Sequence, residues 1–578
     1  MTNTTSKSLR QGSVSGLQMS KQHFKVCFCF KRIFRLKVAE PPHEICTIFD
    51  AYSQNGNMSM DDLYTFLVQF QGERGGDATK KQVQAIFDSL KHLTIFQRKD
   101  LHIEAFFRYL LGNLNGPLAQ DQVHQDMNSP LAHYFLYTGH NSYLTGNQLS
   151  SESSTYPIIE ALKKGVRVIE LDLWPSCKEN DVIVRHGGTL TSSVKLKACL
   201  NAIKDYAFHA SEYPVVITFE DHITTNLQAK VAKMVNDIFG EMLYRPDSQQ
   251  MEIFCSPESL KGKILISTKP PETPDIQGKR VEEERSLNLD DYKQDDLDDQ
   301  GEEDDAIGLG YRDLISIHAG KPKGKIENWL IHHGQARRVS LSEQELEDIA
   351  IKYGTDIVRF TQTNLVRIYP KGMRVDSSNY DPMTGWMHGA QMVAFNMQGH
   401  DHFLNIMQGM FKANGGCGYV KKPDILLNVD KGFDPRETRS IQKTLQQVLV
   451  YMGEGWQSDF GRTHFDLYSP PDFYVKVDIH GVPADIATKE TRTIEDEWVP
   501  VWNELLSFPL TVPELALLYI KVGERDFSGK PDFGGQTCLP VFELTEGIRA
   551  VRLYDRKGEL YNSVRLLLQF QFVNNTNA

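Results

Sequence analysis

The sequence predicts a multidomain protein of the α+β class, and three observations support this prediction. First, its 578 residues are too many for one hydrophobic core, since a domain usually holds about 100 to 200 residues. Second, apolar residues repeat with helical spacing near the start, alternate between strand-like and helical runs in the middle, and form short strand-like runs near the end. Third, a strongly acidic run interrupts the middle region, which we therefore expect to consist of two halves.

Residues 1–41 are predicted to form a basic N-terminal tail. Residues 1–37 contain eight Lys or Arg and no acidic residue, and the stretch FKVCFCFKRIFRLK mixes these charges with aromatic side chains. A disordered, solvated tail is the simpler expectation for such a terminus. The alternative is contact with an anionic lipid surface, which would gain roughly 1 kcal/mol per basic residue.

Residues 42–118 are predicted to form a small helical domain. The stretches HEICTIFDAY, MDDLYTFLVQF, KKQVQAIFDSL and HIEAFFRYLLG place apolar residues three and four positions apart. Between the first two lies AYSQNGNMSMDD, which is shaped like an EF-hand loop with Gly56 at its turn. Its first position is Ala51 and its last is Asp62 rather than Glu, so we expect an EF-hand-like domain with a structural role and without calcium.

Residues 128–271 and 311–425 are predicted to be two halves of one α/β domain. In the first half VRVIELDLW, DVIVRHG, YPVVITFEDH and KGKILISTK are typical of strands, whereas KLKACLNAIKDYAF and LQAKVAKMVNDIFG are typical of helices. In the second half we expect strands at DLISIHA, DIVRFTQ, NLVRIYP and AQMVAFNMQ. Alternating strands and helices indicate a parallel sheet, either open or closed into a barrel.

Residues 272–310 separate these halves and are predicted to be a disordered acidic linker. Within them, residues 282–305 hold 13 Asp or Glu against two basic residues, so this short run carries most of the net charge of −12. One hypothesis is that the linker covers the mouth of the site and inhibits it. Residues 444–573 then change to strand-like runs such as FYVKVDIHGV, ALLYIKVGERD and SVRLLLQFQF, separated by Gly, Pro and Asp turns, which predicts a β-sandwich.

Composition excludes several classes of function. No concentrated basic field supports binding of nucleic acid, and no run approaches the ~18 apolar residues of a membrane-spanning helix. Eight cysteines without a CxxC pair argue against a disulfide framework or a zinc site. We therefore expect a cytoplasmic protein in a reducing compartment.

Ionisable side chains at the ends of strand-like runs are the candidate site. TGHNSYL carries His140 and Asn141, VIELDLW carries Glu170 and Asp172, VIVRHGG carries His186, and VITFEDH carries Glu220. In a barrel of parallel strands, active-site groups come from the carboxyl ends of several strands. The sequence therefore predicts that these six side chains meet at one end of the sheet.

Glu170 and Asp172 are two residues apart and so leave a strand on the same face. Two buried carboxylates repel each other unless a cation compensates, and Ca²⁺ prefers oxygen ligands. Glu220 and the amide oxygen of Asn141 would complete such a cage. For any one of these carboxylates alone, a salt bridge is the simpler interpretation.

The two histidines and one arginine suit phosphate chemistry. Taken singly, His140 and His186 could be ordinary imidazoles, but beside a metal they suit proton transfer and charge stabilisation. In NLVRIYPKGMRVDSSNY, Arg367 shares a strand face with Tyr369 and can donate a forked pair of hydrogen bonds to phosphate. A surface ion pair is the alternative for this arginine.

These motifs, in this order, resemble the eukaryotic phosphoinositide-specific phospholipases C, and in detail their short plant-type members. The resemblance spans about residues 42–572. It includes an X box with GHNSYL, IELDLW, RHGGTLTS and FEDH, and a Y box with VSLSE, RIYPKGMRVDSSNY and NGGCGYVKKP. It implies an EF-hand-like helical domain, a split TIM-type (β/α) barrel of X and Y halves, and a C-terminal C2 β-sandwich.

The resemblance also implies roles for individual residues. The catalytic calcium would be held by Asn141, Glu170, Asp172 and Glu220. His140 would stabilise the pentacoordinate phosphorane, His186 would help to protonate the departing diacylglycerol oxygen, and Glu170 is a candidate general base. The inositol ring and its phosphates would be contacted by Lys269, Ser340, Arg367 and Tyr369. In the C2-like region, the loop residues that resemble calcium ligands are Asp496, Glu524, Asp526 and Asp532.

The implied activity is calcium-dependent hydrolysis of phosphatidylinositol phosphates in intracellular signalling. The products from phosphatidylinositol 4,5-bisphosphate would be diacylglycerol and inositol 1,4,5-trisphosphate, formed through a cyclic phosphodiester. Animal members carry two lysines in the segment matching ILISTK, whereas this chain has Ser267 at the first position and keeps only Lys269. This departure bears on the preference for the doubly phosphorylated lipid.

We expect a monomer that is peripheral on the plasma membrane and contacts its anionic surface. The main alternative is a non-catalytic, calcium-dependent phospholipid-binding scaffold. A weaker one is a phosphodiesterase acting on soluble glycerophosphodiesters, which would not need the long sandwich.

Overall fold

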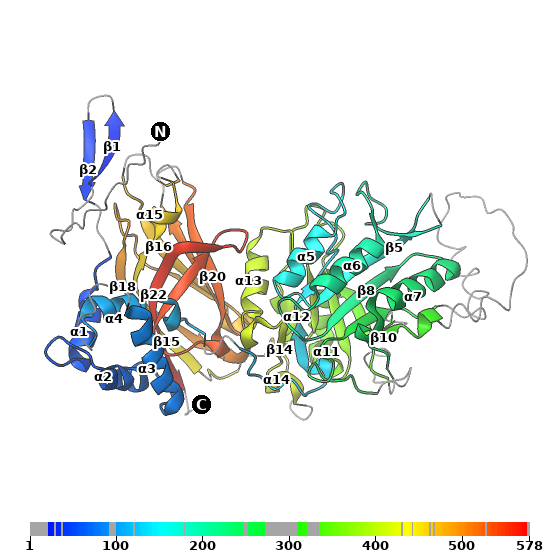
Figure 1. Cartoon of the computed structure of the whole chain (residues 1–578), viewed down its shortest axis with the longest axis horizontal. Helices are drawn as coiled ribbons and strands as arrows, with labels where there is room; N and C mark the ends of the chain where they lie inside the picture. Colours follow the sequence, from blue (N-terminus) through cyan, green and yellow to red (C-terminus); the bar gives the residue numbers. More distant parts are fainter. Residues whose placement is uncertain are drawn as a thin grey trace, which may run out of the picture.

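The structure is a computed structural model of the whole chain (Figure 1). It describes residues 21–27, 30–35, 39–91, 100–118, 122–177, 180–246, 252–271, 310–320, 330, 335–428, 432–437, 439–441, 443–461, 464–465, 469–525 and 529–574. The acidic linker therefore lies outside the described residues, apart from Gly310 at its end.

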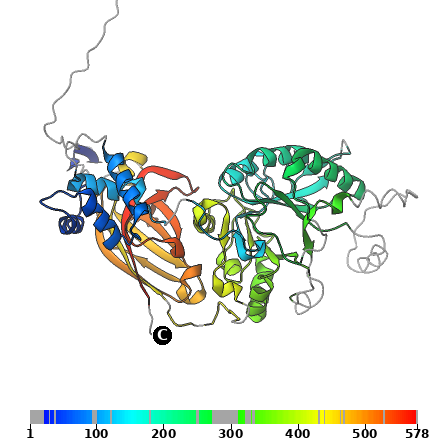
Figure 2. The same ribbon diagram turned by 60° about the horizontal axis from the view of Figure 1, so that its bottom comes forward.

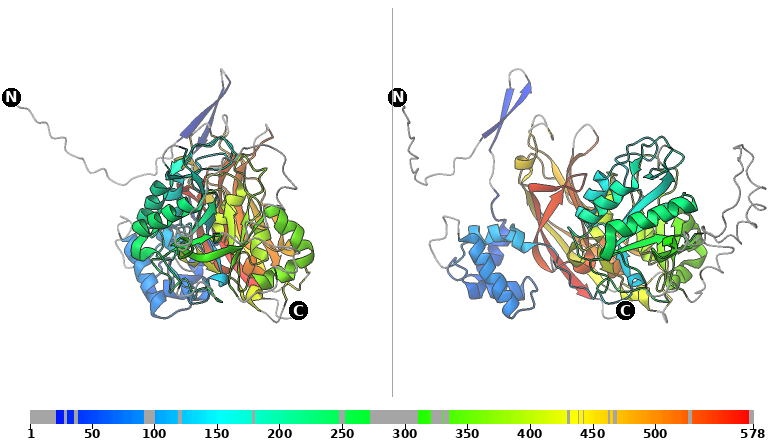
Figure 3. Two further views of the ribbon diagram at one scale, coloured as in Figure 1. Left: turned by 90° about the vertical axis from the view of Figure 1, so that its right-hand side faces the viewer. Right: turned by 45° about the vertical axis from the view of Figure 1, so that its right-hand side comes forward.

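The described chain begins with an antiparallel hairpin of β1 (Lys21–Cys27) and β2 (Phe30–Arg35). The hairpin projects from the rest of the molecule (Figure 3). For these residues the structure differs from the expected disordered tail. Within KQHFKVC only the stretch HFKV alternates polar and apolar residues, and this short period of two is a weak strand signal.

The helical domain is built from α1 (His43–Tyr52), α2 (Met60–Gln69), α3 (Asp77–Leu90) and α4 (Ile103–Leu110). In the EF-hand-like loop, Asp62 forms a capping box with Ser59 at the start of α2: the Asp62 N–H donates to Ser59 Oγ, and Asp62 Oδ2 accepts from the Ser59 N–H at 2.9 Å. The last carboxylate of this loop therefore serves the helix terminus, as expected of a structural loop.

The middle of the chain forms a closed barrel of parallel strands. Each barrel strand pairs with the barrel strand that follows it in the sequence. The last one, β13, pairs with the first, β4, which in turn pairs with β5, so the ring is closed. The barrel strands are β4 (Thr138–Gly139), β5 (Val168–Pro175), β8 (Val215–Asp221), β9 (Ile264–Thr268), β10 (Ile315–Gly320), β11 (Arg338–Ser342), β12 (Leu365–Tyr369) and β13 (Met392–Phe395). The predicted split barrel is confirmed.

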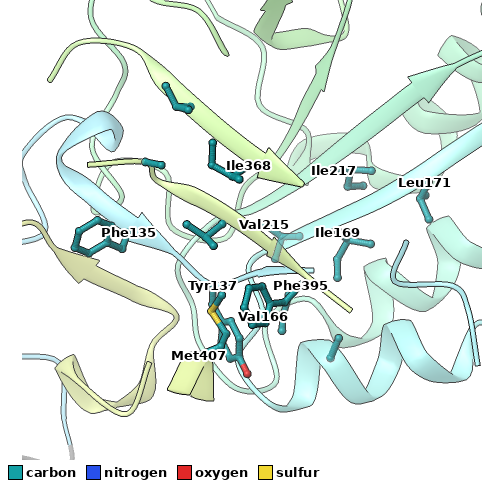
Figure 4. Close-up of a cluster of buried hydrophobic side chains, with 14 of the residues drawn as sticks. Phe135, Tyr137, Val166, Ile169, Leu171, Val215, Ile217, Ile368, Phe395 and Met407 are labelled. Carbon is teal, nitrogen blue, oxygen red and sulfur yellow. The ribbon is translucent and has the colours of Figure 1, made fainter. Parts of the chain in front are cut away.

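Helices cover the outside of the barrel. They are α5 (Tyr156–Lys163), α6 (Leu196–Tyr206), α7 (Thr225–Phe239), α11 (Glu343–Phe360), α12 (Met383–Met387), α13 (His402–Met410) and α14 (Asp424–Leu427). Figure 4 shows part of the core between strands and helices, with Ile169 and Leu171 on β5, Ile217 on β8 and Ile368 on β12. Because these residues alternate with Glu170 and Asp172, the polar residues of β5 face the inside of the barrel.

Further short elements surround the barrel. A small antiparallel pair, β3 (Tyr134–Leu136) and β14 (Tyr419–Lys421), joins the two halves. Among the described residues, the 3₁₀ helices are η2 (Leu131–His133), η3 (Gly240–Met242) and η4 (Asn414–Gly416) in the α/β region, η1 (Asn113–Asn115) after α4, and η5 (Pro483–Asp485), η6 (Pro513–Leu515) and η7 (Val541–Glu543) in the C-terminal region.

One strand prediction in the α/β region is wrong, and one predicted strand forms but lies outside the parallel barrel. DVIVRHG forms β6 (Val182–Val184), which pairs antiparallel with β5 and with β7 (Val194–Lys195) beyond the barrel wall. DIVRFTQ belongs largely to α11, where its apolar residues complete the buried face of a long helix. A short apolar run cannot by itself distinguish a strand from a buried helix segment.

The C-terminal region is an antiparallel sandwich. Its strands are β15 (Lys443–Glu454), β16 (Phe473–His480), β17 (Ala487–Glu490), β18 (Val501–Leu510), β19 (Leu517–Glu524), β20 (Asp532–Pro540), β21 (Gly547–Tyr554) and β22 (Leu560–Asn574), with α15 (Trp456–Asp459) at one end. β20 and β21 meet through the single pair Gln536 and Tyr554, so the sheet divides there into two halves. Both halves contribute to one apolar core, as predicted for a sandwich.

The sandwich lies between the helical domain and the barrel (Figures 1 and 2). On one side the Gln71 amide donates to the Ile548 carbonyl at 2.8 Å and accepts from the Ile548 N–H at 2.6 Å. On the other side α13 packs against β20 so closely that a Cβ on Gly409 would lie 2.4 Å from Cys538 Cβ. No helix within the described ranges is both long and apolar enough to cross a membrane.

Candidate active site

A cavity of about 370 Å³ opens at the carboxyl ends of the barrel strands. Its lining comprises His140, Asn141, Gln148, Glu170, Asp172, His186, Glu220, Lys269, Ala319, Gly320, Arg338, Ser340, Arg367, Tyr369, Pro370, Lys371, Gly372, Arg374 and Asn396. Every residue that the sequence singled out in the barrel lines this one cavity.

The acidic residues meet because β5 and β8 are in register. Asp172 pairs with Glu220 across these parallel strands, and Glu170 lies one inward position deeper on β5. Asn141 is the second residue after β4 and has a positive φ of 43°, which Asn tolerates better than most residues. This turn lets the Asn141 N–H donate to Glu170 Oε2 at 3.1 Å.

Glu170 is held ionised by its neighbours. Burial raises the pKa of its carboxyl, but the Arg367 guanidinium, His140 and the Asn141 N–H more than offset this effect, so the pKa lies below its ordinary value. Arg367 forms an ion pair with Glu170, and both side chains are at most 4% exposed. For Glu170, the salt bridge that the sequence analysis gave as the alternative to metal binding is therefore formed.

Asp172 has the opposite electrostatics. Burial, and then the negative charge of Glu170, raise the pKa of its carboxyl well above the ordinary value. Its Oδ1 is buried and has no hydrogen-bond partner. A hydrogen bond from Tyr143 and the charge of Arg367 favour its ionised form, but they do not offset these two effects.

His140 is oriented by a buried amide network. Its Nδ1 donates to Asn396 Oδ1 at 2.9 Å, and its Nε2 lies 4.0 Å from Glu170 Oε2. The Gln148 amide donates to the same Asn396 oxygen at 3.0 Å, while Gln148 Oε1 accepts from Asn141 Nδ2 at 2.9 Å. Burial lowers the pKa of the His140 imidazole, although Glu170 opposes this shift.

His186 reaches the cavity from outside the barrel wall. It follows β6, and its Nδ1 donates to the Gln148 backbone carbonyl at 2.8 Å. The prediction placed His186 at the end of a barrel strand. The structure instead brings it to the rim through a hairpin appended to β5, with Nε2 left for proton transfer.

The candidate phosphate-binding residues come from three further strands of the wall. Lys269 follows β9, Ser340 is on β11, and Arg367 and Tyr369 share the inward face of β12. Arg367 lies 5.5 Å from the Tyr369 ring centroid. These four side chains line the cavity together, although Arg367 also forms an ion pair with Glu170.

The acidic end of the cavity has the chemistry of a hard divalent cation site. Its donors are oxygens of Asn141, Glu170, Asp172 and Glu220, and the partnerless Asp172 Oδ1 is an atom that a cation would satisfy. In this structure Arg367 occupies the position beside Glu170. Within the described part of the chain, no group of three His, Cys, Asp or Glu side chains is arranged closely enough to hold a metal ion. The residues fit the cation, with Asp172 as the ligand that needs it most.

Sequence reasoning missed several lining residues. Asn396 directly follows the carboxyl end of β13, and Arg338 lies two residues before Ser340 on β11, so strand-end position and the period of two could have identified both. Arg374 comes from a loop and forms a forked ion pair with Glu343, at 2.6 and 2.9 Å. Gln148 also lies in a loop, and no local pattern pointed to it.

The candidate calcium ligands of the sandwich are only partly together. Glu524 and Asp532 face each other on β19 and β20, but Glu524 is fully buried. The Asp496 N–H donates to Asp472 Oδ1 at 2.8 Å, which adds a carboxylate that the sequence analysis did not name. Asp526 lies outside the described residues.

A closed parallel barrel with carboxylates, imidazoles and cations at its strand ends defines a barrel enzyme acting on a phosphorylated substrate. Family models agree with this class. The X domain of phosphatidylinositol-specific phospholipase C matches residues 127–270, its Y domain matches residues 323–425, and the C2 domain matches residues 447–555.

Individual relatives narrow the class further. "Phosphoinositide phospholipase C 2" from Arabidopsis thaliana is 54% identical over 587 residues, covering 96% of this chain and all of the relative. The Mus musculus "1-phosphatidylinositol 4,5-bisphosphate phosphodiesterase delta-3" is 33% identical, covering 92% of this chain and 68% of the relative. The crystal structure of L. pealei PLC21 superposes with a TM-score of 0.73 at 27% identity, covering 93% of this chain and 69% of the other. This chain belongs to the phosphoinositide-specific phospholipase C family.

Proposed function

We propose that this chain is a calcium-dependent phosphoinositide phospholipase C acting at the cytoplasmic face of the plasma membrane. Its preferred substrate would be phosphatidylinositol 4,5-bisphosphate, and its products diacylglycerol and inositol 1,4,5-trisphosphate. The observation that carries the proposal is a single cavity that brings together two imidazoles, three carboxylates and several cations. The names of the relatives support the same reaction class.

The first step is attack of the inositol 2-hydroxyl oxygen on phosphorus. The hydroxyl proton passes to Glu170, whose carboxylate is ionised because its pKa lies below the ordinary value. In its protonated form, which the charge of Glu170 favours, His140 donates from Nε2 to the phosphoryl oxygens, because Nδ1 is committed to Asn396. The bond between phosphorus and the glycerol oxygen breaks, and His186 donates a proton to that oxygen.

The second step opens the cyclic phosphodiester with water. By microscopic reversibility His186, now neutral, takes a proton from the attacking water, and the 2-oxygen recovers its proton from Glu170. The product is a single inositol phosphate that carries the phosphate at position 1 and a free 2-hydroxyl. The Gln148 carbonyl holds the His186 ring in one orientation through both steps.

Calcium would be held by Asn141, Glu170, Asp172 and Glu220. When bound, the cation supplies positive charge that lowers the pKa of the inositol 2-hydroxyl and offsets charge on the phosphoryl oxygens. Lys269, Ser340, Arg367 and Tyr369 would bind the inositol ring and its phosphates. Arg367 has a double role here, since it also neutralises Glu170.

Membrane contact is proposed to involve the C2 sandwich. Asp496, Glu524, Asp526 and Asp532 are its candidate calcium ligands, and a calcium ion there would bridge to anionic lipid. The positions of Glu524 and Asp532 on paired strands support a shared site, whereas the full burial of Glu524 weighs against its direct contact with lipid. A monomer would suffice, because the catalytic cavity is built from one chain.

The test is release of water-soluble inositol phosphate from phosphatidylinositol 4,5-bisphosphate in detergent micelles. His140→Ala and His186→Ala should each lower turnover about 10²-fold or more, whereas the exposed His209→Ala is the matched control and should keep it. Excess chelator should abolish turnover, and Mg²⁺ should restore it poorly. Parent-level rates in either active-site variant would refute the assigned roles.

Liposome sedimentation separates this proposal from the scaffold alternative. Calcium-dependent binding to anionic liposomes without release of inositol phosphate would favour a scaffold. The lining of the cavity, with both histidines and all four candidate calcium ligands in place, favours the enzyme.

A further inference from the structure

Arg338 is a buried cation in the cavity for which the reaction described above has no use. It lies on the inward face of β11, two residues before Ser340, and its side chain lines the cavity although the residue is only 2% exposed. Its Nε and Nη1 are buried and have no hydrogen-bond partner. Leaving guanidinium donors unsatisfied in a protein interior is costly, so this arrangement points to an absent ligand.

Arg338 also differs from the other two arginines of the cavity. Arg367 is neutralised by its ion pair with Glu170, and Arg374 by its forked pair with Glu343. Among the described residues, no carboxylate lies within ion-pair distance of the Arg338 guanidinium. Burial lowers the pKa of Arg338 to about 10, which still leaves it protonated at neutral pH.

The position of Arg338 in the barrel indicates which part of a ligand it meets. In the closed order of eight strands, β11 stands four places from β5 and therefore on the opposite wall. β5 carries Glu170 and Asp172, so the reacting phosphodiester belongs on that side. A group reached by Arg338 is then on the far side of the inositol ring.

We propose that Arg338 is a phosphate-binding residue that determines headgroup specificity: it binds a phosphate on the inositol ring other than the one linked to glycerol. This inference rests on the proposed function and deepens it, since it assigns a preference for ring-phosphorylated lipids to one residue. A guanidinium suits this role because its planar fork matches two phosphate oxygens.

The experiment compares hydrolysis of phosphatidylinositol, its 4-phosphate and its 4,5-bisphosphate in identical detergent micelles. Arg338→Met removes the charge but keeps an unbranched side chain. It should lower kcat/KM for the phosphorylated lipids by about 10-fold to 100-fold, mainly through KM, and leave phosphatidylinositol within about twofold. Arg359→Met, an exposed arginine on the following helix α11, is the matched control and should change none of the three rates.

Competition distinguishes a lipid headgroup from free phosphate as the ligand. Soluble inositol 1,4,5-trisphosphate should inhibit hydrolysis of phosphatidylinositol more strongly than inositol 1-phosphate, and Arg338→Met should remove the difference. Inhibition by inorganic phosphate alone that equals inositol trisphosphate would overturn the ring-phosphate assignment.

Two outcomes would overturn the inference. An equal loss for all three lipids would assign Arg338 to the scissile phosphate or to folding, and equal rates for parent and variant would remove its role. If Arg338→Met does not fold, Arg338→Lys is tested instead. This variant keeps the charge but loses the forked guanidinium, so it must reduce discrimination between the lipids. A parent protein without activity on any lipid would refute the proposed function instead.

Discussion

Replacing Asp172 with Asn should both stabilise this protein and abolish its activity. The Asp172 carboxyl is buried beside Glu170, its Oδ1 has no hydrogen-bond partner, and its pKa is raised well above the ordinary value by burial and by the neighbouring charge. A site that holds like charges together without their counterion stores an unfavourable interaction. Asn keeps the shape and removes the charge.

The pH dependence of this gain has a definite sign. Below the ordinary Asp pKa of about 3.9, both folded and unfolded chains keep the proton, and the substitution changes little. As the pH rises, the unfolded chain releases its proton first while folded Asp172 retains it, so the parent loses stability until the pH passes the raised folded pKa. The advantage of the variant should therefore grow from pH 5 toward pH 8.

The expected magnitude is about 1–3 kcal/mol at neutral pH, the usual cost of a buried unsatisfied polar group. For a barrel of this size it corresponds to a rise of about 2–10 °C in the Tm of the barrel transition. Calorimetry in chelator between pH 5 and pH 8 measures it. Calcium should then raise the Tm of the parent more than that of Asp172→Asn. A variant that is less stable at pH 8, or equally stabilised by calcium, would refute the reasoning.

Three further predictions concern residues outside the predicted set. Asn396→Ala removes the acceptor that orients His140 and should lower kcat about 10-fold to 100-fold with little change in KM, whereas Asn396→Asp, which keeps an acceptor oxygen, should retain more activity in the same assay. Gln71→Ala leaves buried backbone groups of the sandwich unsatisfied, so chemical denaturation should show a loss of about 1–3 kcal/mol while micellar turnover stays at the parent level. Gly409→Ala should destabilise the contact between barrel and sandwich by about 1–3 kcal/mol through its clash with Cys538, and an unchanged Tm would contradict the close packing described here.

The catalytic end of the barrel was predictable because strand periodicity and strand ends are local signals. Glu170 and Asp172 lie two apart on one strand face, and Glu220 is the last residue but one of the next barrel strand, so their meeting follows from a parallel sheet alone. The resemblance to a known family added the roles of these residues and joined the two halves into one closed barrel.

Contacts made between distant segments left no local signal. Three features depend on tertiary packing: Arg367 pairs with Glu170, Asn396 orients His140, and an antiparallel hairpin brings His186 to the site. Arg338 lies just before the VSLSE motif, outside the motifs that carry the resemblance, so the resemblance implied no role for it. Amphipathic runs such as DIVRFTQ were misassigned because a few apolar residues fit either a strand or a helix.

The most direct test of the central claim is ³¹P NMR of the water-soluble products formed from phosphatidylinositol by purified protein in calcium. If the two imidazoles and the acidic cluster act together on the inositol 2-hydroxyl, a cyclic inositol phosphodiester signal should appear first and then convert to the monoester. Chelation of calcium should abolish both signals. Release of free inositol with phosphatidic acid, or full turnover in excess chelator, would contradict the account.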